Sequence, residues 1–303
     1  MLRRMWTSTL VFSHFRPRSL HTSAATMPSM PSLQLDRSLF NNTLYSRLRE
    51  LWFRGTDDSD TAPSPETAKR WFGAGPQAEK EAFDAECKSI ALPALQSISP
   101  EKLNLPPFQS YDDEIENSGV LAKPFLDEVK QAQREDARKG ADTMLSMALL
   151  LDQMPRNIFR DLSELPIIYR HYDRLAFALI HGALGMAPSP MDHPSLGSRK
   201  YFLWFTLPLE HSEHLRSHEL ETQLQNRWRD EKLESRDEKA KFFYQMNLKS
   251  FEEHMEPIRR FGRYPHRNQC LGRESTKEEE GYLKTANTFG VKQGEKKKEK
   301  DEL

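Results

Sequence analysis

The feature that most constrains the fold is the segment Met144–Pro155, which is apolar on almost every face. A helix that is apolar all round is buried among other elements, so this segment predicts a central helix. Pro155 lacks an amide N–H and is expected to kink or end that helix. The remaining chain shows helical spacing of apolar residues, with no alternating strand pattern and no β-hairpin turn. We therefore predict an all-α protein.

Composition divides the chain of 303 residues into a helical domain, 36–289, and two polar ends. Residues 1–35 are rich in Arg and Ser and contain no acidic residue, which is typical of a transit peptide. We expect a mitochondrial protein, with a cytoplasmic protein that starts at Met27 as the alternative. Residues 290–303 are expected to be a charged, disordered tail. That tail ends in the endoplasmic-reticulum retrieval signal, which makes that compartment a lesser alternative.

Local signals place several boundaries inside the domain. Ser64 before a proline predicts a helix N-cap. Residues 99–123 are rich in Pro, Asp, Glu and Ser, and we expect an extended surface insertion there. A helix is expected from Pro124 to Lys139, where Gly140 breaks it. Ser275–Glu278 reads as a capping box that starts a last short helix.

Several classes of protein are disfavoured by composition. The net charge of −1 argues against a nucleic-acid partner, which needs a broad basic face. Cys87 and Cys270 are the only cysteines, so neither a disulfide framework nor a cysteine zinc site is expected. The longest apolar run, Ala148–Leu151, is too short to span a membrane. Neither a glycine-rich phosphate loop nor a dinucleotide fingerprint occurs, so we expect no cofactor. The oligomeric state is not predicted.

The most basic stretch of the chain, Arg259–Thr276, predicts either an anion site or a set of ion pairs. Between Pro257 and Arg273 it contains no acidic residue. Guanidinium groups match carboxylate and phosphate geometry, often through two hydrogen bonds. The same arginines would also suit buried pairs with Asp and Glu of neighbouring helices.

Two further polar motifs follow apolar helices. In the first, Asp152, Arg156 and Arg160 are spaced so that they share one helix face. They either pair with one another and with the basic stretch or line a pocket. The second motif, Leu207–Glu219, places His211, His214 and His218 at spacings that would allow a zinc site, an alternative we favour less. A histidine among arginines is held in its neutral form, in which it serves as a base.

These three motifs, in this order, closely resemble the family called domain of unknown function 924, over residues 46–289. The resemblance implies a helical, tetratricopeptide-like fold of antiparallel hairpins in one compact domain. It implies no established activity. The polar residues of the three motifs are the family's signature, whereas His214 and His218 are less typical of it.

Three functions follow as hypotheses. The first is a binding protein with an arginine- and histidine-lined pocket for an anionic small molecule or an acidic peptide. The second is a hydrolase or transferase in which His211, Glu213 and His266 are catalytic, so whether the chain is an enzyme stays open. The third is a scaffold whose charges are internally paired. Guanidinium groups facing an open cavity would favour the first two, and closed ion pairs the third. The predicted ligand-binding residues are Asp152, Gln153, Arg156, Asn157, Arg160, Glu210, His254, Arg260, Arg263, Arg267, Asn268 and Arg273.

Overall fold

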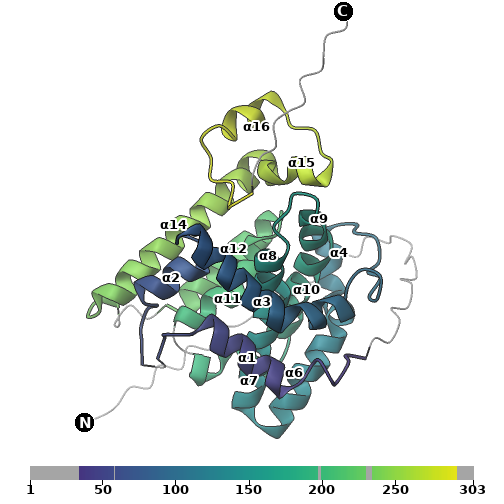
Figure 1. The fold of residues 1–303 in the computed structure, drawn as a ribbon, viewed down its shortest axis with the longest axis vertical. Helices are drawn as coiled ribbons and strands as arrows, with labels where there is room; N and C mark the ends of the chain where they lie inside the picture. The colour runs from purple at the N-terminus through teal and green to yellow at the C-terminus, as the bar shows by residue number, and fades with distance from the viewer. Residues whose placement is uncertain (1–33, 58, 197–198, 230–233, 292–303) are drawn as a thin grey trace, which may run out of the picture.

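The computed structural model describes residues 34–57, 59–196, 199–229 and 234–291, and all regular elements in these ranges are helical (Figure 1). The predicted all-α class is therefore confirmed, while the tetratricopeptide-like arrangement stays a prediction. The predicted transit peptide and most of the predicted tail lie outside the described residues. The helices are α1 (Asn42–Trp52), α2 (Pro65–Trp71), α3 (Gln77–Ser97), α4 (Tyr111–Glu116), α5 (Ser118–Leu121), α6 (Lys123–Glu135), α7 (Ala137–Ala148), η1 (Leu149–Gln153), α8 (Met154–Ile158), α9 (Leu165–Ile167), η2 (Ile168–Tyr172), α10 (Asp173–Leu184), η3 (Pro190–Asp192), η4 (Pro194–Leu196), α11 (Arg199–Glu210), α12 (Leu215–Arg227), α14 (Glu238–Phe261), η5 (Pro265–Arg267), α15 (Asn268–Leu271) and α16 (Lys277–Tyr282).

The central helix runs without interruption through α7, η1 and α8, and its residues from Met144 to Met154 are almost all inaccessible to solvent. The prediction of a buried central helix is confirmed. Pro155 does not end it, because the turn before the proline is a wider π turn. In that turn the amide N–H of Met154 donates to the carbonyl of Leu149, five residues back. The wider turn relieves the clash that a proline ring makes in an ordinary α-helix.

The sequence predicted that the helix breaks at Gly140, but the break between α6 and α7 lies at Asp136. Asp136 is extended, and its side chain accepts a hydrogen bond from the backbone N–H of Lys139, which caps α7. Gly140 lies inside α7, where an added Cβ would come within 2.6 Å of the Cβ of Gln133. The glycine is therefore needed for the close approach of the two helices.

The segment predicted to be an extended insertion contains α4 and α5, so that prediction is wrong for residues 111–121. The hydroxyl of Ser110 caps α4 by accepting from the N–H of Asp113. Both short helices pack against α10, where Leu121 is buried and Glu114 pairs with Arg174 at 2.6 Å. Docking of these few side chains stabilises a segment whose sequence shows no helical period.

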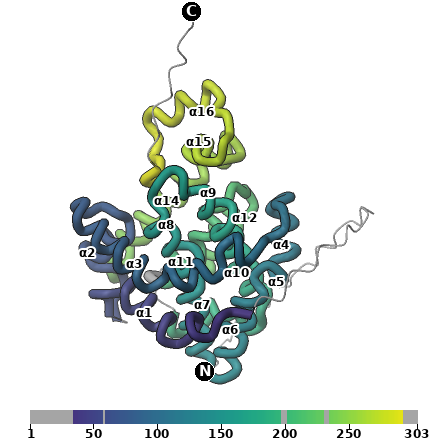
Figure 2. Tube along the Cα trace, turned by 45° about the vertical axis from the view of Figure 1, so that its right-hand side comes forward, coloured from purple at the N-terminus to yellow at the C-terminus, as the bar shows by residue number. Residues whose placement is uncertain are grey.

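The chain leaves the helical body through α14, which ends at Gly262 with φ of 67°. Residues 262–291, called here the C-terminal unit, contain η5, α15 and α16 and lie beyond the end of α14 (Figures 1 and 2). The predicted capping box is displaced by one residue, to Thr276 and Glu279. The carboxylate of Glu279 accepts hydrogen bonds from both Arg263 and the backbone N–H of Thr276. The bond with Arg263 favours a cap at Thr276 over the predicted cap at Ser275.

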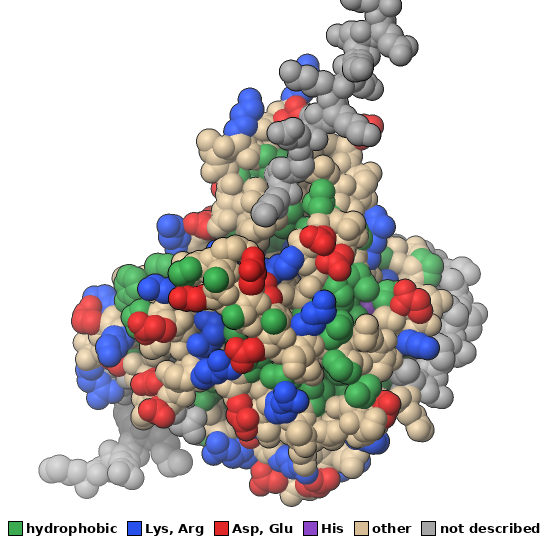
Figure 3. Space-filling model, in the orientation of Figure 1, with side chains coloured by type: hydrophobic (Ala, Val, Ile, Leu, Met, Phe, Trp, Pro, Cys, Tyr) green, Lys and Arg blue, Asp and Glu red, His purple; other side chains and the backbone are tan. Residues whose placement is uncertain are grey.

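On the face drawn in Figure 3, Lys and Arg side chains are interspersed with those of Asp and Glu, and no large area carries one charge alone. Among the helices of residues 34–291 that are described, none combines the length and the apolar character needed to cross a bilayer. Ser64 caps α2 ahead of Pro65, as predicted.

Candidate active site

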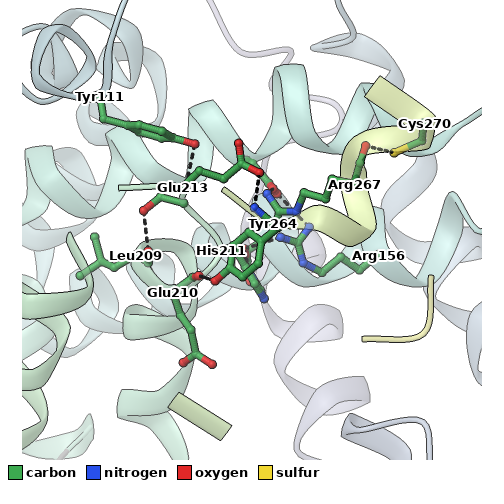
Figure 4. Close-up of polar contacts among 12 residues, drawn as sticks. Tyr111, Arg156, Leu209, Glu210, His211, Glu213, Tyr264, Arg267 and Cys270 are labelled. Carbon is green, nitrogen blue, oxygen red and sulfur yellow. Dashed lines mark hydrogen bonds and ion pairs between the residues drawn. The ribbon is translucent and has the colours of Figure 1, made fainter. Parts of the chain in front are cut away.

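The three predicted motifs meet where the C-terminal unit rests on the helical body (Figure 4). The π turn and α8 supply Asp152 and Arg156, the end of α11 supplies Glu210 and His211, and α14 supplies His254. The three motifs, which are far apart in the sequence, therefore lie together in the structure.

His211 is held by Asp152. The Nδ1 atom of His211 lies 2.7 Å from Oδ1 of Asp152, whose other oxygen accepts from the side-chain amide of Gln153 at 2.5 Å. Burial favours the neutral acid, but His211 and Arg156 outweigh it and lower the pKa of Asp152. An ionised carboxylate only accepts hydrogen bonds, so Nδ1 of His211 carries the proton. Burial, assisted by the positive charge of Arg156, lowers the pKa of His211 and favours its neutral form.

His254 is held in the same way by Glu210. Its Nδ1 atom lies 2.5 Å from Oε1 of Glu210 and 2.9 Å from the carbonyl oxygen of Ser250, so this nitrogen also carries the proton. Burial opposes ionisation of Glu210, but His254 and a hydrogen bond with Glu221 lower its pKa to about 2. Burial and the charge of Glu210 raise the pKa of Glu221 well above its usual range, so Glu221 stays protonated.

The two imidazole rings face one another with their Nε2 atoms unused. Their centroids are 6.0 Å apart, and the side chains of His211 and His254 remain 12% and 10% exposed. Within the part of the chain that the structure describes, neither Nε2 has a hydrogen-bond partner. We use the word crevice only for the partly exposed surface formed by these two rings and the neighbouring side chain of Arg156. Each ring is fixed through one nitrogen and offers the other.

Arg156 and Arg267 both contact the carboxylate of Asp173, which lies next to the crevice. Nη1 of Arg156 donates to Oδ1 of Asp173 at 2.8 Å, and Nη1 of Arg267 lies 3.9 Å from the other oxygen. The guanidinium of Arg267 lies between the rings of Tyr169 and Tyr264, 4.3 and 4.4 Å from their centroids. Three polar atoms in this group, Nη2 of Arg156, Nε of Arg267 and Oδ2 of Asp173, are buried without a hydrogen-bond partner among the described residues.

Glu213 anchors the C-terminal unit to the helical body. Its two oxygens accept from the two terminal nitrogens of Arg273 at 2.6 and 2.8 Å, and from the backbone N–H of Tyr264 at 2.8 Å. Its own backbone N–H donates to the hydroxyl of Tyr111 at 2.9 Å. The hydroxyl of Tyr264 donates to the carbonyl of Glu210 at 2.5 Å (Figure 4). Both oxygens of Glu213 therefore accept hydrogen bonds that join the C-terminal unit to the body, which is the pattern of a structural carboxylate more than of a catalytic one.

Other predicted ligand-binding residues lie outside the crevice, each with a protein partner. Arg263 donates twice to Glu279, at 2.6 and 2.8 Å, and Arg260 donates to Glu278 at 2.8 Å. These pairs, with the hydrogen bond from Asn268 to Ser275, hold the C-terminal unit together. On α8, Arg160 binds both oxygens of Asp84, and Asn157 bonds to the carbonyl of Gln153.

His266, predicted to be catalytic, lies beside the crevice but is enclosed. Only 5% of it is exposed, and its ring contacts those of Tyr264 and Phe289, each with centroids 5.2 Å away. Burial, together with the charge of Arg267, lowers its pKa well below the usual range. Phe289 also stacks on His254 at 3.9 Å. His254, and not the predicted His266, therefore lies beside His211.

The three histidines considered for a zinc site point to different partners. Nδ1 of His214 lies 2.9 Å from the hydroxyl of Ser217, and Nε2 of His218 lies 3.0 Å from the carbonyl of Ser212. No group of three metal-ligating side chains occurs in the described ranges. The helix that would have aligned these histidines is interrupted between α11 and α12.

Sequence reasoning missed three residues of this region. Asp173, Tyr169 and Tyr111 lie outside the three motifs, and Tyr111 belongs to the segment read as an insertion. The spacing around Tyr169 and Asp173 indicates only a helix, so no local signal identifies the carboxylate that two arginines share. Their involvement depends on the packing of α10 and η2 against the C-terminal unit.

Comparisons with known proteins identify the family of this chain. The family model described as "Bacterial protein of unknown function (DUF924)" matches residues 48–287. The chain belongs to this family. No curated protein matches it. A solved structure titled "Structure of Protein of Unknown Function ATU0120 from Agrobacterium tumefaciens" is 24% identical, over 69% of this chain and 98% of that one, with a TM-score of 0.33.

Proposed function

We propose that this protein is an enzyme, a hydrolase or transferase, that binds an anionic substrate beside Arg156 and moves protons through His211 and His254. The observation that carries the proposal is the pair of facing imidazoles, each bound to a carboxylate through Nδ1 and open at Nε2. Hydrolysis and group transfer both require one group that removes a proton and one that donates it. Two adjacent imidazoles that both contact one substrate meet that requirement.

The carboxylates give each imidazole a fixed orientation and tautomer. Because Asp152 accepts from Nδ1 of His211, the lone pair of the neutral ring is on Nε2, toward the crevice. Glu210 and the carbonyl of Ser250 do the same for His254. A carboxylate behind a histidine also stabilises the imidazolium that forms when the ring takes a proton. The lowered pKa of His211 favours its role as the base.

The fixed charges around the crevice carry no positive excess, which makes anion binding depend on protons. Arg156 and Arg267 are positive, while Asp152, Asp173 and Glu210 are negative. An added anion therefore meets no surplus positive charge until one imidazole is protonated. We expect an anion to bind with the uptake of about one proton and to bind more tightly as the pH falls toward the lowered pKa of His211.

The test uses inorganic phosphate as the probe and the full chain. Two-bond ¹H–¹⁵N spectra of the histidine rings report tautomer and protonation, and calorimetry in buffers of different ionisation enthalpy reports proton uptake. We expect the Nδ1–H tautomer in both rings, and phosphate shifts that involve Nε2 of His211. In Asp152→Asn the pKa of His211 should fall further. The opposite tautomer, or phosphate shifts that avoid both rings, would overturn the proposal.

A substrate screen then separates an enzyme from a binding protein. Chromogenic phosphomonoesters, phosphodiesters and carboxylate esters of anionic acids represent the substrate classes. His211→Ala and His254→Ala should each lower any turnover at least a hundredfold. The matched control is His193→Ala, since His193 lies outside the crevice and bonds with Ser195. Turnover that survives both crevice substitutions would contradict the acid–base roles.

A second function, that of a structural clasp, is supported for the basic stretch itself. Arg263 and Arg273 each bind a carboxylate through two hydrogen bonds. We infer that these arginines attach and stabilise the C-terminal unit, while His211 and His254 in the crevice transfer protons. Substitutions of Arg263 should lower stability and leave the histidine tautomers unchanged.

A further inference from the structure

A groove of about 650 Å³ lies outside the crevice, between α6, the start of α7 and the end of α10 with the loop that follows it. Its walls include Leu126, Ala137, Met186 and Pro188, so most of its surface is apolar. None of the crevice residues lines it. A volume of this size is typical of sites for small organic molecules.

The groove carries positive charge without a counter-charge. Lys130 and Arg134 lie one turn apart on the exposed face of α6 and both line it. Neither makes an ion pair with another residue in the described ranges, and the groove lining contains no Asp or Glu. Like charges spaced four residues apart on a helix repel one another, so this pair is unfavourable unless an anion binds between them.

His181 adds a polar group to the inner wall. Its Nε2 atom is buried and has no hydrogen-bond partner within the described chain. Burial, with a smaller effect of His214, lowers the pKa of His181 to about 4, so the ring is neutral near pH 7. Because the ring is neutral, the positive charge of the groove comes from Lys130 and Arg134 alone.

We propose that this groove binds a medium-chain alkyl carboxylic acid, with its carboxylate between Lys130 and Arg134 and its chain along the apolar wall. Two cations that form no ion pair among the described residues fit one carboxylate. The apolar wall of Leu126, Met186 and Pro188 fits an alkyl chain better than a peptide, whose backbone would need hydrogen-bond partners that this wall lacks. The site is separate from the crevice, so it does not rest on the function proposed above.

The test titrates the full chain with octanoate, acetate and octanol, and follows binding by calorimetry and by NMR. Octanoate should bind at least tenfold more tightly than either acetate, which lacks the chain, or octanol, which lacks the charge. The double substitution K130E and R134E should weaken octanoate binding at least tenfold. The matched control is Lys123→Glu, which reverses a charge on the same helix but outside the groove lining.

Two further variants keep the proposal falsifiable. Ala137→Trp places a large ring at the exposed rim of the groove, keeps both cations, and should also abolish octanoate binding. His211→Ala should leave it unchanged, because His211 belongs to the crevice. Equal binding of acetate and octanoate, equal loss in Lys123→Glu, or no binding at concentrations on the order of 1 mM would overturn the proposal.

Discussion

The arginines of the C-terminal unit and the imidazoles of the crevice are neighbours, yet they differ in which of their polar atoms remain available. Arg263 and Arg273 each present two nitrogens to one carboxylate. His211 and His254 each present one nitrogen to a carboxylate and keep the other toward the crevice. The guanidinium groups are thereby neutralised and fixed, whereas the imidazoles are fixed and still able to exchange a proton.

This difference shows that the density of charge in a sequence motif does not locate reactivity. The basic stretch is rich in arginine, but its arginines mostly join helices to one another. The crevice carries no positive excess and has few exposed atoms, and its chemistry depends on two imidazole rings that each bind a carboxylate through one nitrogen only. The predictions below separate the two regions by changing one while the other is observed.

The largest effect is expected from Glu213→Ala. Removing this carboxylate leaves Arg273 without its partner and the N–H of Tyr264 without its acceptor. Breaking a largely buried ion pair from one side costs about 3–5 kcal/mol. Urea unfolding should show a loss of this size. Glu278→Ala, which breaks the exposed pair with Arg260, should cost less than about 1 kcal/mol. Equal losses in the two variants would contradict the assignment of Glu213 to the clasp.

Much of the fold follows from the sequence, because helical spacing and apolar character act locally. The segment from Met144 is buried as predicted, and the cap at Ser64 is correct. The errors arise where tertiary packing decides. The π turn before Pro155 and the close approach at Gly140 both depend on neighbouring turns or helices. Sequence spacing contains no information about either.

The site could be predicted only in part, for a related reason. The spacing of the first motif placed Asp152 and Arg156 on one helix face, but it contained no information that His211 binds Asp152. Which arginine binds a carboxylate, and which histidine keeps a free nitrogen, depends on distances of a few ångströms between elements far apart in the chain. Asp173 and Tyr111, which belong to no motif, complete the network for that reason.

The second largest effect is a loss of stability in acid caused by His218. Burial lowers its pKa to about 4, against 6.5 in an unfolded chain. The unfolded state therefore binds a proton first as the pH falls, and stability decreases from pH 6.5 until the folded pKa is reached. The shift corresponds to about 3 kcal/mol. His218→Gln should retain a donor to the carbonyl of Ser212 and remove this part of the pH dependence. The free energy of unfolding of both proteins, measured by urea unfolding at pH 7 and 4.5, tests this prediction. An equal loss of stability between the two pH values in His218→Gln and in the unaltered protein would refute it.

Phe289→Ala is expected to affect the crevice more than the clasp. The ring of Phe289 stacks on His254 at 3.9 Å and is half-buried, so its loss should cost about 1–2 kcal/mol. Removing the ring uncovers His254 but leaves the pair of His211 and Asp152 in place. Modification by diethyl pyrocarbonate, followed by peptide mass mapping, should become several-fold faster at His254 only. An equal increase at His211 would mean that the whole crevice had loosened.

The smallest effect concerns Gly262, which turns the chain from α14 into the C-terminal unit. Its φ of 67° is in the left-handed region, and an added Cβ would meet no atom within 4 Å. Gly262→Ala should therefore cost about 1 kcal/mol through backbone conformation alone, and Gly262→Asn less, because Asn tolerates this region better. Neither change removes a hydrogen bond of Arg263 or of Glu213. Both variants should lower stability while the ring spectra of His211 and His254 stay as in the unaltered protein. Altered ring spectra would show that the clasp holds the imidazoles in place, and the two regions would then be a single unit.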